Sequence, residues 1–167
     1  SDCEIIIHMY VKYGILDTLS MINGEFAFAL YDLEKQEIFL ARDPYGVRAL
    51  YLMENYYDNF TNPIIFGSEM KMLHPFLNIC DKLKIQQFKP GHYMKFSNIN
   101  IKYWTTNNIM LPYYQRPNFY KAPDYITEEE ALGKIATALE NSIKRRVTTS
   151  ERPIACLLSG GLDSSLV

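Results

Sequence analysis

The segment from Glu25 to Asp32 carries apolar side chains on both of its faces. Successive side chains of a strand point to opposite faces. One face is formed by Phe26, Phe28 and Leu30, and the other by Ala27, Ala29 and Tyr31. Because neither face is polar, we expect a sheet that is covered on both sides. The polar turn 33–36 leads into a second strand, Glu37–Ala41, so the two strands form a hairpin.

Further helices and strands are expected around this hairpin. A helix at Ser1–Tyr13 opens with a capping-box pair, Ser1 and Glu4. Gly14 stands at the position that typically ends a helix. The remaining elements are strands at Val47–Met53 and Ile64–Gly67, a helix at Ser68–Leu73 with Ser68 as its N-cap, and a hairpin of His92–Phe96 with Ile101–Trp104.

The segment 105–124 is rich in proline and asparagine and has no periodic pattern. It is interpreted as a linker whose aromatic residues pack on a neighbouring part of the protein. A long helix then follows Thr127, which forms a second capping box with Glu130. The basic cluster Lys144–Arg146 could bind phosphate, but a solvated helix end is the favoured interpretation. The apolar residues at helical spacing are Leu132, Ile135, Leu139, Ile143 and Val147.

The segment Pro153–Val167 places a glycine-rich turn after a short apolar run. Ile154–Leu158 is expected to be a strand buried on both faces. Gly160 and Gly161 leave backbone N–H groups open to an anion, and a helix is expected to begin near Asp163. Added hydroxyl donors come from Ser159, Ser164 and Ser165. The segment predicts a phosphate site, which is not of the Walker type because Gly-Lys-Ser/Thr is absent.

The string Ser-Gly-Gly-Leu-Asp-Ser-Ser after this run resembles the pyrophosphate loop of the ATP pyrophosphatase family. Enzymes of that family split ATP between the α and β phosphates to adenylate a substrate. The resemblance implies that the loop holds the released pyrophosphate and that Asp163 lies at the metal end of the site.

The composition is that of a globular protein, with 48% hydrophobic and 14% aromatic residues. A net charge of −2 gives no reason to expect a nucleic acid or an anionic membrane as partner. No apolar run reaches the roughly 20 residues that span a bilayer, and no signal peptide is evident, so we expect a cytoplasmic protein. Cys3, Cys80 and Cys156 lack metal-ligand spacing and are interpreted as buried free thiols.

Several blocks of the chain together resemble glutamine-dependent asparagine synthetase. They are Ser1–Glu4, Asn23–Ala29 with Ala41–Arg48, and the terminal Ser-Gly-Gly-Leu-Asp-Ser-Ser. Ser68–Lys71 and Pro90–Tyr93 follow in the expected order, so the resemblance covers nearly the whole chain. The first blocks are similar to class II glutamine amidotransferase domains in general. The last block distinguishes asparagine synthetase from other families that contain such a domain. Glutamine phosphoribosylpyrophosphate amidotransferase, for example, shares Arg-Asp-Pro-Tyr-Gly but joins it to a different synthase domain.

The resemblance implies an α+β fold in two parts. Residues 1–112 would be the C-terminal part of a class II amidotransferase domain, a partial N-terminal-nucleophile hydrolase αββα sandwich of antiparallel sheets. Residues 113–126 would be a linker. Residues 127–167 would supply the first helix, strand and pyrophosphate loop of a doubly wound α/β ATP-binding domain.

The resemblance also implies an activity for the complete family protein. An N-terminal cysteine releases ammonia from glutamine, and the ammonia passes through an internal tunnel. The second domain uses ATP with Mg²⁺ to convert aspartate to β-aspartyl-AMP, which ammonia converts to asparagine. A thiolate is a strong nucleophile at neutral pH, and adenylation makes AMP a good leaving group.

Few residues of this chain match the family's sites. Asp2 matches the carboxylate that holds the α-amino group of the substrate glutamine. Arg42, Asp43 and Gly46 are interpreted as architectural, because a neighbouring arginine and aspartate usually pair or bond the backbone. Asp163 is the candidate contact to Mg²⁺-pyrophosphate. The ATP site is matched by Leu158, Ser159, Gly160, Gly161, Asp163, Ser164 and Ser165.

The family's nucleophilic cysteine, its carboxylate-binding arginine and its Asn-Gly oxyanion segment all match positions upstream of Ser1. Cys3 cannot replace the nucleophile, because it lies on a helix and lacks a free α-amino group. Ser1 is better explained as a helix cap than as a nucleophile. We therefore expect a fragment with neither glutaminase nor synthetase activity of its own. Ala49 stands where the family usually has proline, a change that a small residue should tolerate.

Two other interpretations stay open at this point. One is a different amide-forming, ATP-dependent ligase on the same framework, such as a β-lactam synthetase. The other is a non-catalytic module that binds glutamine or a partner subunit. An incomplete sandwich would expose a strand edge and an apolar face, which predicts aggregation or a homodimer through that edge.

Overall fold

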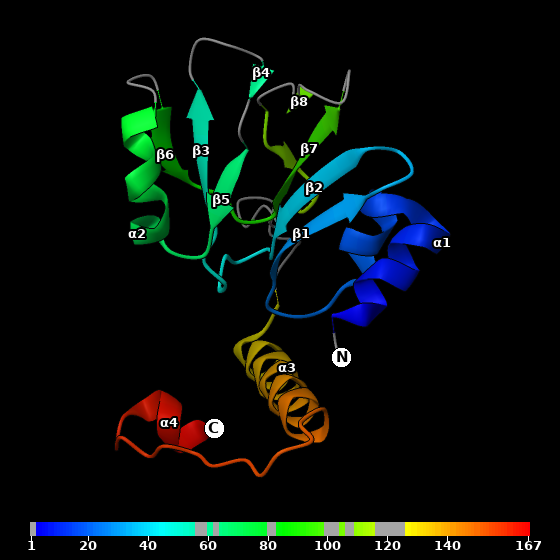
Figure 1. The fold of residues 1–167 in the computed structure, drawn as a ribbon. Coiled ribbons are helices and arrows are strands. Elements are labelled where there is room, and N and C mark those ends of the chain that lie inside the picture. Colours follow the sequence, from blue (N-terminus) through cyan, green and yellow to red (C-terminus); the bar gives the residue numbers. More distant parts are fainter. Residues whose placement is uncertain are drawn as a thin grey trace. The chain divides into compact units, whose positions relative to one another are not determined.

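The computed structural model describes residues 3–55, 60–61, 64–79, 83–98, 104–105, 109–115 and 126–167. The chain divides into two compact units, Ser1–Pro117 and Asn118–Val167, and each is described by itself (Figure 1). The elements in chain order are α1 (Glu4–Met21), β1 (Ala27–Asp32), β2 (Glu37–Arg42), β3 (Tyr51–Asn55), β4 (Phe60–Thr61), β5 (Ile65–Gly67), α2 (Met70–Leu73), the 3-10 helix η1 (His74–Ile79), β6 (Leu83–Gln87), β7 (His92–Asn98), β8 (Trp104–Thr105), β9 (Leu111–Pro112), α3 (Glu128–Thr148) and α4 (Leu162–Leu166).

The first unit contains two antiparallel sheets. Sheet A has the strand order β1-β2-β7-β8-β4, with β9 paired to β7, and sheet B has the order β5-β3-β6. The predicted hairpin is confirmed as β1 and β2, whose register runs from Ala27 opposite Arg42 to Asp32 opposite Glu37. The second predicted hairpin is confirmed in part: β7 pairs with β8 through Ser97 and Asn98, opposite Thr105 and Trp104, whereas residues 101–103 of the predicted second strand lie outside the described residues.

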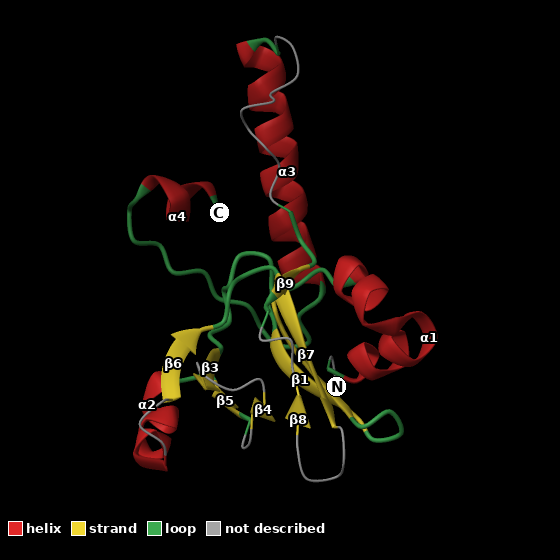
Figure 2. Cartoon of the chain, turned by 90° about the horizontal axis from the view of Figure 1, so that it is seen from above, coloured by secondary structure: helices red, strands yellow, loops and turns green. Residues whose placement is uncertain are grey.

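Sheet A is covered on both faces, as the sequence predicts. On one face, Tyr10 of α1 packs with Leu30 and Phe39, and Leu19 of α1 packs with Phe26 and Ala41. On its other face, sheet A meets sheet B, and α2 contacts β5 beyond it (Figure 2). The unit is therefore a mixed α+β structure with antiparallel sheets, as expected. The core between the sheets consists of Leu40, Leu50, Leu52, Phe88, Met94 and Phe96.

Element α1 runs to Met21, but it consists of two helices that are separated at Gly14, so the predicted end of the first helix at this glycine is confirmed. Gly14 has a φ of 79° and a ψ of 175°, so it leaves the helical conformation and kinks the helix. The hydroxyl group of Thr18 donates a 2.6 Å hydrogen bond to the Gly14 carbonyl oxygen, and Leu19 is buried against sheet A. The second helix, residues 15–21, was not predicted from the sequence, and it packs on sheet A through Leu19.

Strand β3 begins at Tyr51 and not at Val47, as predicted. The N–H groups of Val47 and Arg48 donate to the carboxylate of Asp43 at 3.1 Å, so they do not enter a strand ladder. Strands β4, β6 and β9 were not predicted from the sequence. β9 falls within the segment interpreted as a linker.

Helix α2 is also shorter than predicted. Its N-cap is Glu69, and no side chain makes a capping hydrogen bond, so the prediction of Ser68 as the cap is wrong. The chain continues directly from α2 at Leu73 into η1 at His74, so the helical segment ends in the tighter 3-10 geometry.

The second unit contains the predicted long helix, α3. Both bonds of its capping box are present: the N–H of Glu130 donates to the Thr127 hydroxyl oxygen, and the N–H of Thr127 donates to the Glu130 carboxylate, each at 3.2 Å. None of the α3 side chains is buried within the described residues, the basic cluster at its end included. None of the helices in the described part of the chain is both long and apolar enough to cross a bilayer.

The prediction of a buried strand at Ile154–Leu158 is wrong for this structure. The segment is extended chain without strand pairing, and the side chain of Leu157 is 93% exposed. A parallel strand needs a neighbour to accept its backbone hydrogen bonds, and the described residues of this unit include no strand. No sheet is thus formed within the described residues of this unit.

Candidate functional site

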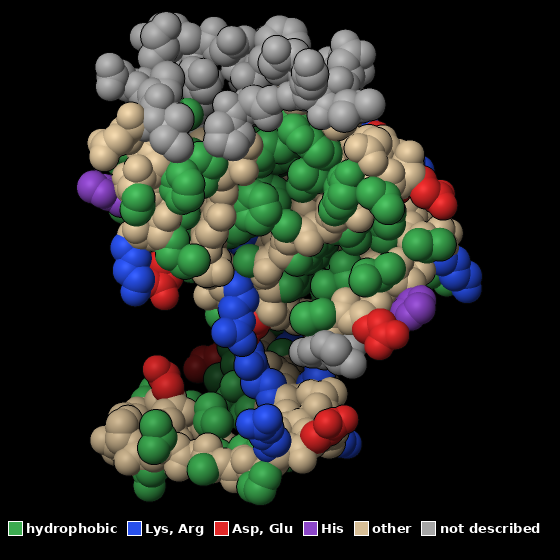
Figure 3. All heavy atoms as spheres, in the orientation of Figure 1, with side chains coloured by type: hydrophobic (Ala, Val, Ile, Leu, Met, Phe, Trp, Pro, Cys, Tyr) green, Lys and Arg blue, Asp and Glu red, His purple; other side chains and the backbone are tan. Residues whose placement is uncertain are grey.

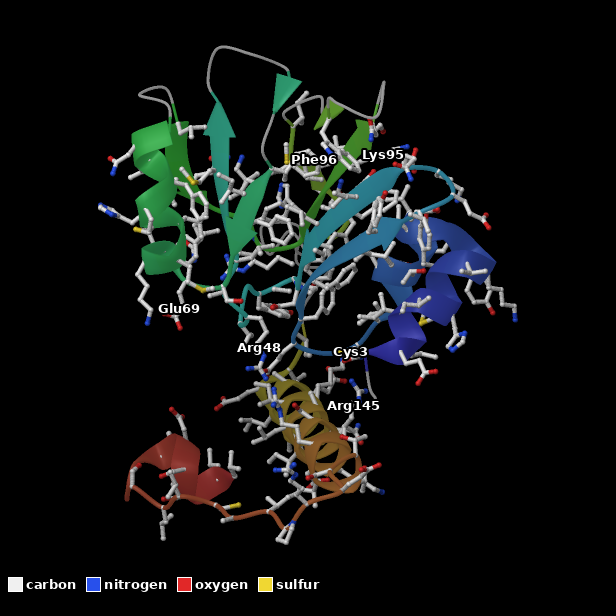
Figure 4. The ribbon with its side chains drawn as sticks, viewed as in Figure 1. Cys3, Arg48, Glu69, Lys95, Phe96 and Arg145 are labelled. Atoms are coloured by element: carbon white, nitrogen blue, oxygen red, sulfur yellow. The ribbon has the colours of Figure 1, made fainter. Side chains whose placement is uncertain are left out.

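The first candidate region is the N-terminal end of α1. Ser1 and Asp2, the predicted cap and the predicted glutamine ligand, lie outside the described residues. Cys3 precedes the helix and is exposed, as is Cys156, so the prediction of buried thiols is wrong for both (Figure 4). Cys80 also lies outside the described residues.

A groove of about 660 Å³ begins beside Cys3 and runs between α1 and the β1–β2 hairpin. Most of its lining is apolar. The lining consists of Cys3, which precedes α1, of Ile6, Ile7, Tyr10 and Val11 from α1, and of residues 28–35 from the hairpin. The sequence did not predict this groove, because it forms only where the helix crosses the strand.

A polar cluster of Tyr10, Asp32 and Lys35 lies along this groove. The Tyr10 hydroxyl donates to Asp32 Oδ2 at 2.6 Å, and Lys35 Nζ lies 3.3 Å from both the Tyr10 hydroxyl and Asp32 Oδ2. The N–H of Lys35 donates to Asp32 Oδ1 at 2.9 Å and closes the hairpin turn. The cluster therefore ties α1 to the hairpin.

These contacts shift the ionisation of all three groups. The pKa of Asp32 is lowered to about 2, chiefly by the Lys35 backbone N–H and then by the Tyr10 hydroxyl. Burial, followed by the hydrogen bond to Asp32, raises the pKa of Tyr10. Hydrogen bonds to Tyr10 and then to Asp32 raise the pKa of Lys35. Asp32 is therefore a carboxylate and Lys35 an ammonium group at neutral pH.

The Arg-Asp-Pro-Tyr-Gly loop after β2 is built around two buried charged side chains, Arg42 and Asp43, 3% and 1% exposed. Nε, Nη1 and Nη2 of Arg42 donate to the carbonyl oxygens of Arg48, Phe88 and Gly46, each at 2.6 Å. Asp43 accepts bonds from the N–H groups of Tyr45, Val47 and Arg48 at 3.0–3.1 Å. The interpretation of Arg42 and Asp43 as architectural residues is confirmed, since all of these bonds go to backbone.

Gly46 and Gly91 allow the chain to turn tightly around this pair. Both have a φ of 67°, and a Cβ at Gly46 would lie 2.7 Å from Pro90 Cγ. The N–H of Gly91 donates to the Asp43 carbonyl oxygen at 2.9 Å. Gly46 is therefore required for backbone conformation and for space.

Tyr113 covers the same loop from a distant part of the sequence. Its hydroxyl donates to the Arg42 carbonyl oxygen at 2.7 Å, and its ring stacks on Phe26 with centroids 6.4 Å apart. Burial, together with the charge of Asp43, raises the pKa of Tyr113. The N–H groups of Tyr113 and Tyr114 both donate to the Gly91 carbonyl oxygen. The prediction that the linker aromatics pack on a neighbour is confirmed for these two tyrosines, whereas Phe119 and Tyr120 lie outside the described residues.

The second candidate region is the Ser-Gly-Gly-Leu-Asp-Ser-Ser loop of the second unit. Gly160 has a φ of 81°, and α4 begins directly after Gly161. The hydroxyl groups of Ser159 and Ser164 lie 2.9 Å apart, and the Ser165 hydroxyl donates to the Gly161 carbonyl oxygen at 2.8 Å. The structure thus brings the predicted serines and glycines of the loop together into a turn.

The other predicted members of this site are less organised. Leu158 is 74% exposed, and Asp163 is exposed in the first turn of α4. Among the described residues, no three His, Cys, Asp or Glu side chains are grouped to hold a metal ion. A single carboxylate still suits Mg²⁺, because this ion is often bound through one or two carboxylates and the phosphates of a substrate.

Comparisons with known proteins match both units of the chain. Residues 1–111 match the glutamine amidotransferase domain family, and residues 134–167 match the asparagine synthase family. The chain is 33% identical over its whole length to a probable glutamine-hydrolysing asparagine synthetase of Schizosaccharomyces pombe, and it spans 27% of that protein. It is 36% identical to the human glutamine-hydrolysing asparagine synthetase, with 99% of this chain and 30% of the human protein aligned. A probable asparagine synthetase of Dictyostelium discoideum is also 36% identical, over all of this chain and 27% of its own length.

The chain thus spans less than a third of the curated relatives that it matches. The amidotransferase match lies within the first unit, and the asparagine synthase match lies within the second unit. The chain belongs to the glutamine amidotransferase domain family, and its amidotransferase domain is followed by the start of an asparagine synthase domain.

Proposed function

We propose that this chain is the junction region of a glutamine-hydrolysing asparagine synthetase. In the complete protein, glutamine and water would give glutamate and ammonia. Aspartate and ATP would give β-aspartyl-AMP and pyrophosphate, and ammonia would then displace AMP to give asparagine. The amidotransferase part would belong to the N-terminal-nucleophile hydrolase fold, and the second part would open a doubly wound ATP-binding domain.

One observation carries this proposal. Asparagine synthetases align with 99–100% of the chain, across the junction between the two family matches, and not with one unit alone. A glutaminase domain joined to another kind of synthase would be expected to lose similarity after the first unit. We retain residues 113–126 as the proposed linker and 127–167 as the start of the ATP domain.

In this proposal, Asp2, which precedes α1 in the sequence by two residues, binds the α-amino group of the substrate glutamine. A helix dipole favours a carboxylate near the helix N-terminus, so that the site costs little stability when glutamine is absent. The Arg42–Asp43 loop contributes rigidity and takes no part in the chemistry, because its charged groups are fully engaged with backbone atoms.

In the second unit, the loop of Ser159, Gly160 and Gly161 would hold the β and γ phosphates of ATP, with Ser164 and Ser165 donating hydroxyl groups. The positive φ of Gly160 and the free volume around it support this role, because a Cβ there would meet no atom within 4 Å and an anion can approach the backbone. Mg²⁺ would neutralise phosphate charge, with Asp163 as its contact from the protein. Leu158 would line the nucleotide side of the loop.

We further propose that the polypeptide of residues 1–167 has neither activity alone, since no residue of it is assigned as the glutaminase nucleophile and the described residues of the second unit include no strand to support its phosphate loop. The purified 167-residue chain should release no glutamate from glutamine and no pyrophosphate from ATP with aspartate. Isothermal titration with glutamine, and separately with ATP and Mg²⁺, measures binding without turnover. Glutamate release that is lost in a Cys3→Ala variant would contradict the proposal directly, because Cys3 would then be a nucleophile.

A further inference from the structure

We propose that residues 109–114, here called the strap, anchor the junction of the chain to the first unit, and that Tyr113 is a positioning residue for nitrogen transfer in the complete protein. The strap lies near the end of the first unit, which extends to Pro117. It includes Tyr113 and Tyr114, the first two residues of the proposed linker. The inference rests on the proposed function, because it concerns how glutamine hydrolysis and asparagine formation are kept together.

The strap packs on two separate hydrophobic cores. Met110 packs on the core between the two sheets, and Tyr113 packs on the core between sheet A and α1. Between these two residues, β9 pairs with the first two residues of β7. Successive side chains of an extended segment point to opposite faces, so Met110 and Tyr113, three residues apart, reach opposite faces of sheet A. The strap therefore connects the packing layers on both faces of this sheet.

Hydrogen bonds from backbone and side chain fix the end of the strap. The N–H groups of Tyr113 and Tyr114 donate to the Gly91 carbonyl oxygen at 3.0 and 3.2 Å. The Tyr113 hydroxyl donates to the Arg42 carbonyl oxygen at 2.7 Å. Gly91 in turn donates its N–H to the Asp43 carbonyl oxygen. The strap thus ends on the same loop that Arg42 and Asp43 hold in place.

The side chains beneath Tyr113 belong to the interior of the first unit. Phe26, whose ring stacks on that of Tyr113, is 9% exposed, and Ala41 of the same core is fully buried. By contrast, the hydrophobic side chains that Figure 3 shows over α1 and β1 lie at the surface. Because the strap is held by buried contacts, its attachment does not depend on what covers that surface.

A firm attachment matters for a protein that passes ammonia from one reaction to another. In the proposed reaction, water converts glutamine to glutamate and ammonia, and ammonia then displaces AMP from β-aspartyl-AMP. Ammonia that escapes leaves glutamate without asparagine. When the strap opens, the free tether between the two parts becomes longer, and the effective concentration of linked parts falls once a tether exceeds the span that it must bridge. Tyr113 would therefore keep the two reactions coupled without contact with either substrate.

Amide hydrogen exchange of the purified 167-residue chain tests the strap by itself. Tyr113→Phe removes one hydrogen bond and keeps the ring on Phe26, so the amides of Tyr113 and Tyr114 should exchange about fivefold faster. Met110→Ala removes only packing at the other end, and it should accelerate the same two amides because the strap opens as one unit. Unchanged exchange of these amides in either variant would overturn the proposal.

The matched control for both measurements is Tyr45→Phe. The Tyr45 hydroxyl lies 3.4 Å from the Tyr114 hydroxyl, which is longer than the usual O–H···O hydrogen bond. Its removal should leave the exchange of the strap amides as in the wild-type chain.

The positioning role is tested in the complete protein, with glutamine as nitrogen donor. Tyr113→Phe should raise the ratio of glutamate to asparagine formed by up to about fivefold. The kcat and KM of glutamine hydrolysis, and asparagine formation from added ammonia, should stay as in the wild type and in Tyr45→Phe. An unchanged ratio, or an equal loss of both activities, would overturn the positioning role. A wild-type protein that forms no asparagine would contradict the proposed function and with it this role, whereas the exchange result would still stand for the strap.

Discussion

The hydroxyl group of Tyr113 donates a 2.7 Å hydrogen bond to the backbone carbonyl oxygen of Arg42, 71 residues earlier in the chain. Through this bond, the end of the amidotransferase unit is fixed to the loop that follows β2. The loop in turn reaches Phe88 through the Arg42 guanidinium and Gly91 through the Asp43 carbonyl oxygen. Three segments that are distant in sequence thus share one buried polar centre, here called the Arg42–Asp43 centre.

Removal of the Tyr113 hydroxyl should weaken this centre. Tyr113→Phe keeps the stacking on Phe26 but leaves the Arg42 carbonyl oxygen without this donor, so we expect a loss of about 1 kcal/mol in the free energy of unfolding. Urea denaturation monitored by tryptophan fluorescence measures this change in the free energy of unfolding. Tyr45→Phe is the control, because the Tyr45 side chain is 70% exposed and its hydroxyl makes only a 3.4 Å contact with Tyr114. Equal effects of the two substitutions would argue against a structural role for the Tyr113 bond.

A side chain at Gly46 should be strongly destabilising. Gly46→Ala combines a positive φ with a Cβ 2.7 Å from Pro90 Cγ, and the expected loss is about 1–3 kcal/mol. Gly24→Ala serves as the matched control, because no atom lies within 4 Å of a Cβ there and the φ is not in the left-handed region. Its effect should stay within about 0.5 kcal/mol. If the two variants had the same unfolding midpoint in urea, the loop that contains Gly46 would accommodate the side chain without loss of stability.

The Tyr10–Asp32–Lys35 cluster predicts a specific dependence of stability on pH. The pKa of Asp32 is about 2 in the folded chain and 3.8 for an unperturbed aspartate. Because the folded-state pKa is the lower one, the stabilisation is fully present above the unfolded value and is lost as the pH falls through the folded value. The difference in unfolding free energy between the wild-type chain and Asp32→Asn should therefore be constant near neutral pH and shrink between about pH 4 and pH 2.

The comparison with Asp32→Asn removes the contribution of other carboxylates, which titrate in both proteins. Glu34→Gln is the control in the same turn, and its difference from wild type should not follow this profile. A wild-type advantage over Asp32→Asn that grows as the pH falls would reverse the predicted sign and contradict the contacts of Asp32.

The capping box of α3 should stabilise the helix measurably. Thr127→Ala removes the acceptor for the Glu130 N–H, with an expected cost of about 1 kcal/mol in helix stability. Amide exchange in the first turn of α3 should accelerate about fivefold. Thr137→Ala, in the middle of the same helix, should leave exchange in the first turn unchanged, since the Thr137 hydroxyl bonds only the Gly133 carbonyl oxygen. No acceleration in Thr127→Ala would show that the box is not formed in solution.

Elements that depend on local signals could be predicted from the sequence. The β1–β2 hairpin follows from alternating apolar residues around a polar turn, and the Thr127–Glu130 box follows from spacing alone. The architectural role of Arg42 and Asp43 also followed from their adjacency. In these cases, the residues that decide the structure are close together in the chain.

Most of the features that were missed depend on distant partners, and strand β6 is the exception. The second helix of α1 needs sheet A beneath Leu19, and the groove beside Tyr10 exists only where two elements cross. Strand β6 carries a weak alternating pattern in Leu83–Gln87 that could have been recognised. The predicted strand at Ile154–Leu158 has the composition of a buried parallel strand, but hydrogen bonding to a neighbouring strand is needed to form one, and composition does not supply it.

We propose that this chain is the junction of an asparagine-forming, glutamine-hydrolysing ligase. The most direct test of this proposal is to isolate from its source the protein that contains these residues and to measure products with glutamine, aspartate, ATP and Mg²⁺. We expect asparagine, AMP and pyrophosphate in equal amounts, with glutamate formed from glutamine. A complete protein that carries Asp2→Ala should form much less asparagine when glutamine is the nitrogen donor. Glutamate without asparagine, or an amide formed on a different acceptor in a substrate panel, would contradict the proposal.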